Sequence, residues 1–163
     1  MSSKDGQPME ANSVQPPFEL IEHTADVGII AYGWTLTELF ENAARGMFSI
    51  IANIDRVKPQ RSVNVDVEAS DYEMLLVKWL RELLYQHDAC GLLFCDFKVK
   101  ELSELSAVEH SQVSQIALRG VARGQPINEA DVELYGDIKA VTYHGLKVER
   151  EGGVWRAQII FDV

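Results

Sequence analysis

The stretch TLTELFENAARGMFSII, residues 35–51, gives the strongest indication of the fold class, because it contains both a helix start and a helical apolar period. Thr35 and Glu38 have the spacing of a capping box, in which the hydroxyl and the carboxylate accept hydrogen bonds from main-chain N–H groups at the helix start. Apolar residues then recur at intervals of three and four: Leu36, Leu39, Phe40, Ala43, Ala44, Met47, Phe48 and Ile51. This period predicts an amphipathic helix that buries one face against a flat surface.

A second helix is predicted by the same two signals. Ser70 and Glu73 again have the spacing of a capping box. The apolar stripe behind them consists of Leu75, Leu76, Trp79, Leu80, Leu83 and Leu84. We expect this helix to end between His87 and Gly91, since glycine is common just past the last turn of a helix.

The remaining segments have the patterns of β-strands. Val63, Val65 and Val67 alternate with polar residues, which is the period of a half-buried strand. Residues 18–33 predict two strands separated by a polar interruption. Four further strands are predicted, over residues 93–101, 107–122, 138–149 and 154–162. The last two are joined at Glu151-Gly152-Gly153, where glycines supply the positive φ angles of a tight hairpin. Together these elements predict an α+β fold, a two-layer sandwich of two helices packed on a mostly antiparallel sheet.

Length and composition predict one domain. With 163 residues, 47% of them hydrophobic, the chain can bury one core but is short for two ordinary domains. Residues 1–17 are polar and contain three prolines, so we expect a disordered tail before a single domain at residues 18–163. The chain has no apolar run long enough to cross a membrane and no secretory signal pattern behind Met1. A cytoplasmic location without membrane contact is therefore expected.

The charge balance argues against direct nucleic-acid binding. The chain has 15 Lys and Arg residues against 25 Asp and Glu, and a formal net charge of −10 repels phosphate backbones. A basic protein partner, or solubility alone, fits this charge better. The two cysteines, Cys90 and Cys95, are expected to be reduced thiols. The sequence contains neither a glycine-rich phosphate loop nor a serine nucleophile elbow.

Ionisable residues gather at two places where apolar strands are interrupted or end. Glu22, His23 and Asp26 lie in the polar segment between the first two strands, which is either a solvated turn or part of a functional edge. Asp162 and the terminal carboxylate of Val163 follow buried-strand sequence. Repelling carboxylates at a semi-buried position require a cation, and hard divalent ions take carboxylate and carbonyl oxygens as ligands.

The countercharge has an alternative source in the chain itself. Lys139, near the start of the preceding strand, could neutralise these acids in place of a metal ion. Residue spacing alone does not place Asp26 beside Asp162, so the two acidic places remain separate at this point.

Four segments resemble the signatures of the archease family. The amino-terminal ones are EHTADVG at residues 22–28 and LFENAA at residues 39–44. The carboxyl-terminal ones are IKAVTYHGLKV at residues 138–148 and IIFDV at residues 159–163. The resemblance covers residues 18–163, and the segments occur in the family's order.

This resemblance implies a role as a protein cofactor and not as an enzyme in its own right. Archeases serve RtcB-type RNA ligases in tRNA splicing and RNA repair, where they promote guanylylation of the ligase and allow repeated turnovers. The family's divalent-ion site corresponds to Asp26, Asp162 and Val163, with Ca²⁺ as the first choice and Mg²⁺ or Mn²⁺ as alternatives. Its functionally important lysine corresponds to Lys139.

Two histidines and two further functions stay open. His23 and His144 are candidates for hydrogen bonds that support the site, and an ordinary structural role is an equal alternative for each. A chaperone-like role toward a tRNA methyltransferase, also attributed to archeases, is the second function. A metal-dependent hydrolase is the third, although no general base beside a metal-bound water is evident. The loop at residues 128–137 is less basic than the family pattern, which argues against an RNA contact there.

Overall fold

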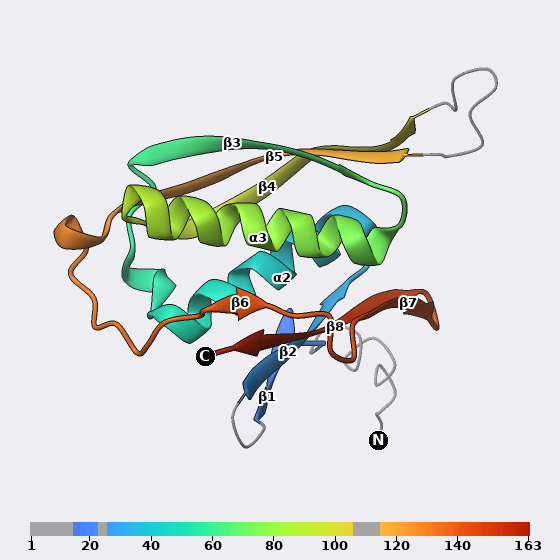
Figure 1. Cartoon of the computed structure of the whole chain (residues 1–163), viewed down its shortest axis with the longest axis horizontal. Coiled ribbons are helices and arrows are strands. Elements are labelled where there is room, and N and C mark those ends of the chain that lie inside the picture. The colour runs from blue at the N-terminus through green and yellow to red at the C-terminus, as the bar shows by residue number, and fades with distance from the viewer. Residues whose placement is uncertain (1–14, 23–25, 106–114) are drawn as a thin grey trace, which may run out of the picture.

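The computed structural model describes residues 15–22, 26–105 and 115–163 (Figure 1). The strands are β1 (Phe18–Glu22), β2 (Asp26–Gly33), β3 (Arg61–Ala69), β4 (Leu92–Leu105), β5 (Gln115–Pro126), β6 (Ala140–Val141), β7 (Lys147–Glu151) and β8 (Val154–Asp162). The helices are α2 (Leu36–Ile51) and α3 (Tyr72–Cys90), with short 3-10 turns η1 (Ile54–Arg56) and η2 (Ile127–Glu129). The predicted tail falls largely outside the described residues. Within them, no helix is both long and apolar enough to cross a membrane.

The strands form two antiparallel sheets, and the helices lie between them (Figure 1). The five-stranded sheet has the order β1-β2-β8-β6, with β7 also pairing with β8. The three-stranded sheet has the order β3-β5-β4. The predicted α+β class, with two helices packed on antiparallel strands, is confirmed. The strands divide between two sheets where one was expected, because period-two alternation marks a strand without telling which strand it pairs with.

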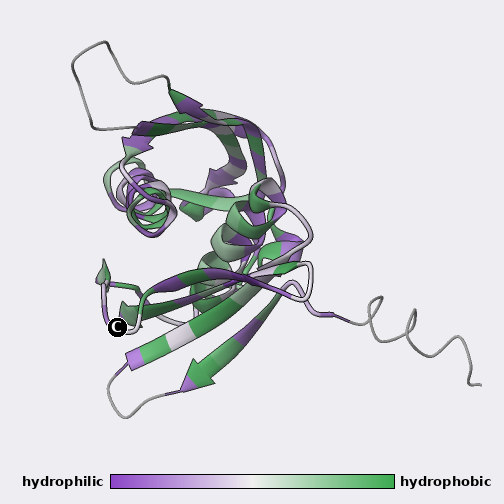
Figure 2. Cartoon of the chain, turned by 90° about the vertical axis from the view of Figure 1, so that its right-hand side faces the viewer, coloured by the Kyte–Doolittle hydropathy of each residue, from purple (hydrophilic) through white to green (hydrophobic). Residues whose placement is uncertain are grey.

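One apolar core joins the helices to both sheets. The apolar residues of α2 and α3 that the sequence singled out are buried, apart from Leu36, which packs on the core while partly exposed. The ring centre of Phe48 on α2 lies 5.4 Å from the ring centre of Phe94 and 5.5 Å from that of Phe97, both on β4. Trp79 on α3 is fully buried and donates its indole N–H to the carbonyl of Phe40 at 3.0 Å. Figure 2 shows the alternation of hydrophobic and hydrophilic residues along the strands that line this core.

The helix starts confirm one capping box and correct the other. The Thr35 hydroxyl accepts from the N–H of Glu38 at 3.1 Å, and the Glu38 carboxylate accepts from the N–H of Trp34 at 2.7 Å. The second predicted box is wrong by one residue, because Asp71, not Ser70, caps α3 by accepting from the N–H of Met74 at 2.7 Å. A carboxylate suits the positive end of the helix dipole better than a hydroxyl does.

The carboxyl-terminal strands also differ in one respect from the prediction. The segment expected as one strand at 138–149 is two short strands, β6 and β7, separated by a turn in which Gly145 has a φ of 60°. The hairpin between β7 and β8 is confirmed, with φ angles of 60° at Gly152 and 83° at Gly153. The break at the Gly145 turn lets β6 and β7 pair with different parts of the same strand, β8.

Candidate functional site

Asp26 and Asp162 lie directly opposite each other on neighbouring strands. They form the terminal pair in the antiparallel register of β2 and β8. Directly opposed residues project to the same face of a sheet, with Cβ atoms roughly 4.5–5.5 Å apart. Asp26 is half-buried and Asp162 is exposed. The fold therefore brings Asp26 and Asp162 together, which residue spacing alone did not establish.

The main chain of Lys139 lies beside Asp162, at the same end of the sheet. Its N–H donates to the carbonyl oxygen of Asp162 at 2.7 Å, and Ala140 on β6 is registered with Asp162. The side chain of Lys139 is exposed. Among the ion pairs within residues 15–22, 26–105 and 115–163, none involves Asp26, Asp162 or Lys139. The lysine thus lies beside the acids without neutralising them by a direct ion pair in the described structure.

The turn between β6 and β7 brings His144 close to Asp26. The Thr142 N–H and hydroxyl both donate to the carbonyl of Ile160, at 3.0 and 2.9 Å, and the N–H of His144 donates to the Thr142 hydroxyl at 3.2 Å. A hollow of about 310 Å³ is lined by Asp26, His144, Gly145, Gln158 and Ile160. His144 is therefore a neighbour of the acidic pair, whereas His23 lies outside the described residues.

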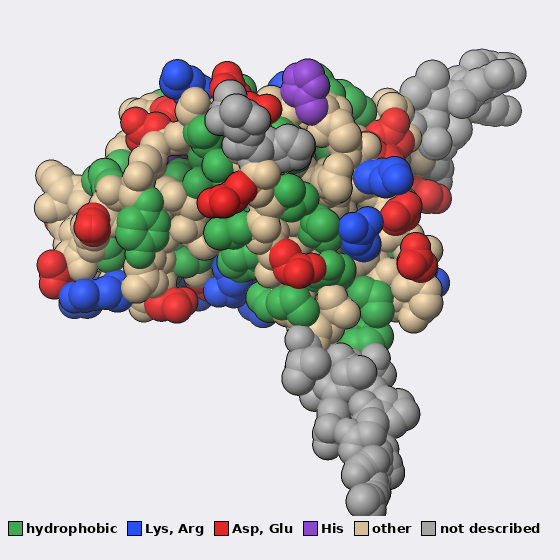
Figure 3. All heavy atoms as spheres, turned by 90° about the horizontal axis from the view of Figure 1, so that it is seen from below, with side chains coloured by type: hydrophobic (Ala, Val, Ile, Leu, Met, Phe, Trp, Pro, Cys, Tyr) green, Lys and Arg blue, Asp and Glu red, His purple; other side chains and the backbone are tan. Residues whose placement is uncertain are grey.

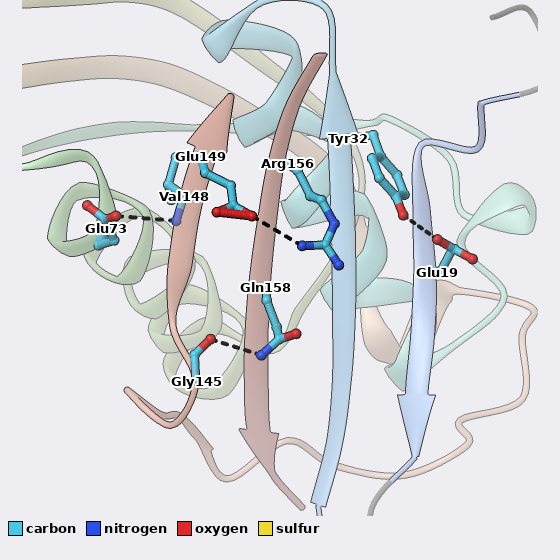
Figure 4. A network of polar contacts seen from close by, with 8 residues as sticks. All are labelled: Glu19, Tyr32, Glu73, Gly145, Val148, Glu149, Arg156 and Gln158. Atoms are coloured by element: carbon cyan, nitrogen blue, oxygen red, sulfur yellow. Dashed lines mark hydrogen bonds and ion pairs between the residues drawn. The ribbon is translucent and has the colours of Figure 1, made fainter. Parts of the chain in front are cut away.

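Helix α3 contacts this turn and the strand β7 that follows it, through polar side chains to which the sequence assigned no role at the site. The Arg81 guanidinium donates to the Tyr143 hydroxyl at 2.7 Å and to the carbonyl of Val141 at 3.1 Å. Its central carbon lies 4.7 Å from the centre of the Tyr143 ring. Nearer the start of α3, Glu73 accepts from the N–H of Val148 at 3.3 Å (Figure 4). Arg81 had no distinguishing pattern, since it occupies an ordinary polar position of an amphipathic helix, and Glu73 was noted only for its place at the helix start.

We expect Arg81→Met to lower the free energy of unfolding by about 1–2 kcal/mol, since it removes two hydrogen bonds and a cation–π contact at a partly exposed site. Urea denaturation monitored by circular dichroism measures the change. Lys100→Met, at an exposed position of β4, is the matched control and should change stability by less than about 0.5 kcal/mol. Equal stability of the two variants would show that Arg81 does not anchor the turn.

The donor chemistry of this edge fits a hard divalent cation. Asp26 and Asp162 supply two carboxylates on one face, and the main chain of Val163 supplies a further oxygen next to Asp162. Within the described residues, no group of three or more His, Cys, Asp and Glu side chains is placed to hold a metal ion. Two carboxylates and a main-chain oxygen are fewer than the six to eight ligands that Ca²⁺ takes. Such a site keeps open positions for water or for groups from another molecule.

The sequence and the fold both match known proteins. Residues 18–163 match the model of the Archease protein family (MTH1598/TM1083). The chain is 42% identical to the protein archease of Pyrococcus furiosus, over 90% of this chain and 98% of that one, and 39% identical to that of Methanopyrus kandleri, over 90% and 99%. The solution structure of Methanobacterium thermoautotrophicum protein 1598 superposes with a TM-score of 0.72 at 33% identity, covering 90% of this chain and 99% of that one. The chain belongs to the archease protein family.

Proposed function

We propose that the protein is a cytoplasmic, non-catalytic accessory protein that activates an RtcB-type RNA ligase. In this proposal it promotes the GTP-dependent guanylylation of the ligase and supports repeated turnover in tRNA splicing or RNA repair. Membership of the archease family supports the accessory role. The main structural support for the proposal is the register of β2 and β8, which sets Asp26 opposite Asp162. Lys139 lies beside this pair, with its N–H bound to the carbonyl of Asp162.

Asp26, Asp162 and Val163 are the residues that would hold a divalent cation, Ca²⁺ first and Mg²⁺ or Mn²⁺ as alternatives. Bound there, the cation would neutralise phosphate charge. The carboxylates lie at one end of the paired strands β2 and β8, where Asp162 is exposed and a partner can reach it. Their unfilled ligand positions would be completed by the partner or its nucleotide, which favours an accessory role over a self-contained active site.

Lys139 would supply a positive charge beside the acids. Its main chain is fixed by the hydrogen bond to Asp162, whereas its side chain is exposed and has no ion-pair partner among the described residues. An ammonium group in that position can contact a phosphate of GTP when the chain docks on the ligase. His144, which lines the same hollow as Asp26, would support the site by hydrogen bonding.

The experiment is GTP-dependent guanylylation of a cognate RtcB-type ligase over many turnovers, with Lys139→Met compared against Lys100→Met. We expect wild type and Lys100→Met to accelerate the reaction equally. Lys139→Met should lose about tenfold or more of the acceleration, because it removes the charge while keeping most of the side chain. An unchanged rate with wild-type protein and a verified cognate ligase would contradict the activator role. The chaperone-like role toward a tRNA methyltransferase would then be the function to test.

A further inference from the structure

The end of β8 that carries Asp162 lies between two strands of very different length. On one side β2 pairs with β8 along almost all of its length, as far as Asp26 opposite Asp162. On the other side β6 has only two residues, Ala140 and Val141. The main chain at Asp162 therefore depends on a short edge strand for its support on that side.

The acidic pair opposes the pairing of these strand ends. Like charges that lie directly opposite each other on neighbouring strands destabilise a sheet. Asp26 and Asp162 form such a pair, and none of the ion pairs among the described residues involves either of them. Their repulsion favours separation of β2 from β8 at this end. A cation site needs its carboxylates at a fixed spacing, so the spacing requires support from elsewhere in the fold.

The segment around β6 supplies this support through main-chain carbonyls of β8. The N–H of Lys139 donates to the carbonyl of Asp162 at 2.7 Å. The N–H and the hydroxyl of Thr142 both donate to the carbonyl of Ile160, at 3.0 and 2.9 Å. The same hydroxyl accepts from the N–H of His144 at 3.2 Å. The main-chain position of Asp162 and the turn that contains His144 thus depend on one short segment.

Arg81 of α3 anchors this segment from outside the sheet. Its guanidinium donates to the carbonyl of Val141 at 3.1 Å and to the hydroxyl of Tyr143 at 2.7 Å, on either side of Thr142. The side chain of Val141 is buried, so the core holds β6 by this side chain while Arg81 holds its main chain. Hydrogen bonds from a charged donor are stronger than those between neutral groups, and this contact therefore compensates for the shortness of β6.

The groups that this anchor positions lie at the surface of the molecule. Asp162, Lys139 and His144 are all exposed. Seen from below, one border of the molecule carries acidic, basic and histidine side chains together (Figure 3). A cation can therefore reach the acids without a change in the fold, and their spacing decides how well it binds.

We propose that Arg81 is a positioning residue for the acidic pair. By anchoring β6 and the turn that follows it to α3, Arg81 keeps the end of β8 paired with β2 and sets the spacing of Asp26 and Asp162 for a divalent cation. This inference rests on the cation site of the proposed function. It adds to that site a residue on another element that does not itself touch the cation.

The Ca²⁺ affinity of the protein distinguishes positioning from the effect of charge alone. Loss of a positive charge near two acids would by itself strengthen the binding of a cation, whereas loss of positioning would weaken it. We expect Arg81→Met to lower the Ca²⁺ affinity about tenfold, a usual effect of losing a residue that supports a metal ligand. Titration calorimetry measures the affinity under conditions in which urea denaturation shows the variant to be folded.

Two further variants provide matched controls. Lys78, on the same helix, donates to the carbonyl of Glu68 on β3 at 2.7 Å. Lys78→Met therefore removes the same charge and the same kind of contact from the other sheet, and should change the Ca²⁺ affinity by less than about twofold. Tyr143→Phe keeps every charge and removes one acceptor of Arg81, so it should weaken binding about threefold. The double variant of Arg81→Met and Tyr143→Phe should bind no more weakly than Arg81→Met alone, because the hydroxyl acts through Arg81.

Amide hydrogen exchange without Ca²⁺ tests whether Arg81 acts through β6. The N–H groups of Lys139 and Thr142 donate to β8, so their exchange reports the opening of this pairing. We expect both to exchange about tenfold faster in Arg81→Met than in wild type. Their exchange in Lys78→Met should match wild type.

The outcomes separate this inference from the proposed function. A Ca²⁺ affinity of Arg81→Met equal to or above that of wild type would overturn the positioning role. Wild-type exchange at Lys139 and Thr142 in that variant would also overturn it, because Arg81 would then not act through β6. Wild-type protein that binds no divalent cation would overturn the cation site and this inference with it. If wild type fails to activate the ligase while the Ca²⁺ results are as expected, the activator role falls and the positioning role of Arg81 stands.

Discussion

Trp79→Ala is expected to lower the free energy of unfolding by about 3–5 kcal/mol, the usual cost of removing a large aromatic side chain from a core. Trp79 is fully buried between the helices and the three-stranded sheet, where its ring packs so closely on Gly120 of β5 that a Cβ atom there would lie 3.0 Å from it. The substitution also removes the hydrogen bond from the indole N–H to the carbonyl of Phe40. Because Trp79 connects α3 to α2 and to β5, its loss weakens contacts between all three elements.

Urea denaturation measures this change, and the chain provides its own control. Trp34 is 47% exposed, so Trp34→Ala should cost less than about 1 kcal/mol. A loss for Trp79→Ala as small as that for Trp34→Ala would mean that the core is not organised around α3 as described.

The double variant Asp26→Asn, Asp162→Asn is expected to weaken Ca²⁺ binding by about 100-fold or more. Each substitution keeps the size of the side chain and removes one negatively charged ligand, and Ca²⁺ affinity depends strongly on the number of charged ligands. Titration calorimetry with Ca²⁺, Mg²⁺ and Mn²⁺ measures the change and ranks the three ions. Asp131→Asn is the matched control, since Asp131 is exposed and its ion-pair partner is Arg56. Equal Ca²⁺ affinity of the double variant and of wild type would contradict the proposed cation site at Asp26 and Asp162.

Local patterns predicted the helices well because the signals that specify them lie within a few residues of each other. The capping box at Thr35 and the apolar period of α2 need no information from distant parts of the chain. The start of α3 was missed by one residue because both Ser70 and Asp71 can cap a helix. The contact that engages Glu73 comes from Val148, far along the sequence.

The arrangement of the strands could be predicted only in part. Alternation correctly marks Val65 as buried on β3, yet it cannot show that β3 belongs to a different sheet from β8. The same limit applies to the site. Asp26 and Asp162 each stand out as acids at the end of an apolar strand, but their meeting depends on the pairing of β2 with β8. That pairing follows from the packing of the whole core and not from a motif at either end.

The residues that position the turn beside Asp26 could not be predicted from the sequence. Arg81 and Gln158 occupy positions where polar side chains are common, and only the fold shows that they hold the Tyr143–Gly145 turn beside Asp26. The resemblance to archeases supplied Lys139, and the structure shows its main chain hydrogen-bonded to Asp162.

Multiple-turnover RNA sealing by a cognate RtcB-type ligase, with wild-type protein or with the Asp26→Asn, Asp162→Asn double variant, tests whether the acidic pair takes part in activation. We predict that wild type sustains turnover well beyond one product per ligase molecule. The folded double variant should leave the ligase at the rate it shows alone. Equal turnover with wild type and with the double variant would contradict the proposed function, because the acidic pair would then have no part in activation.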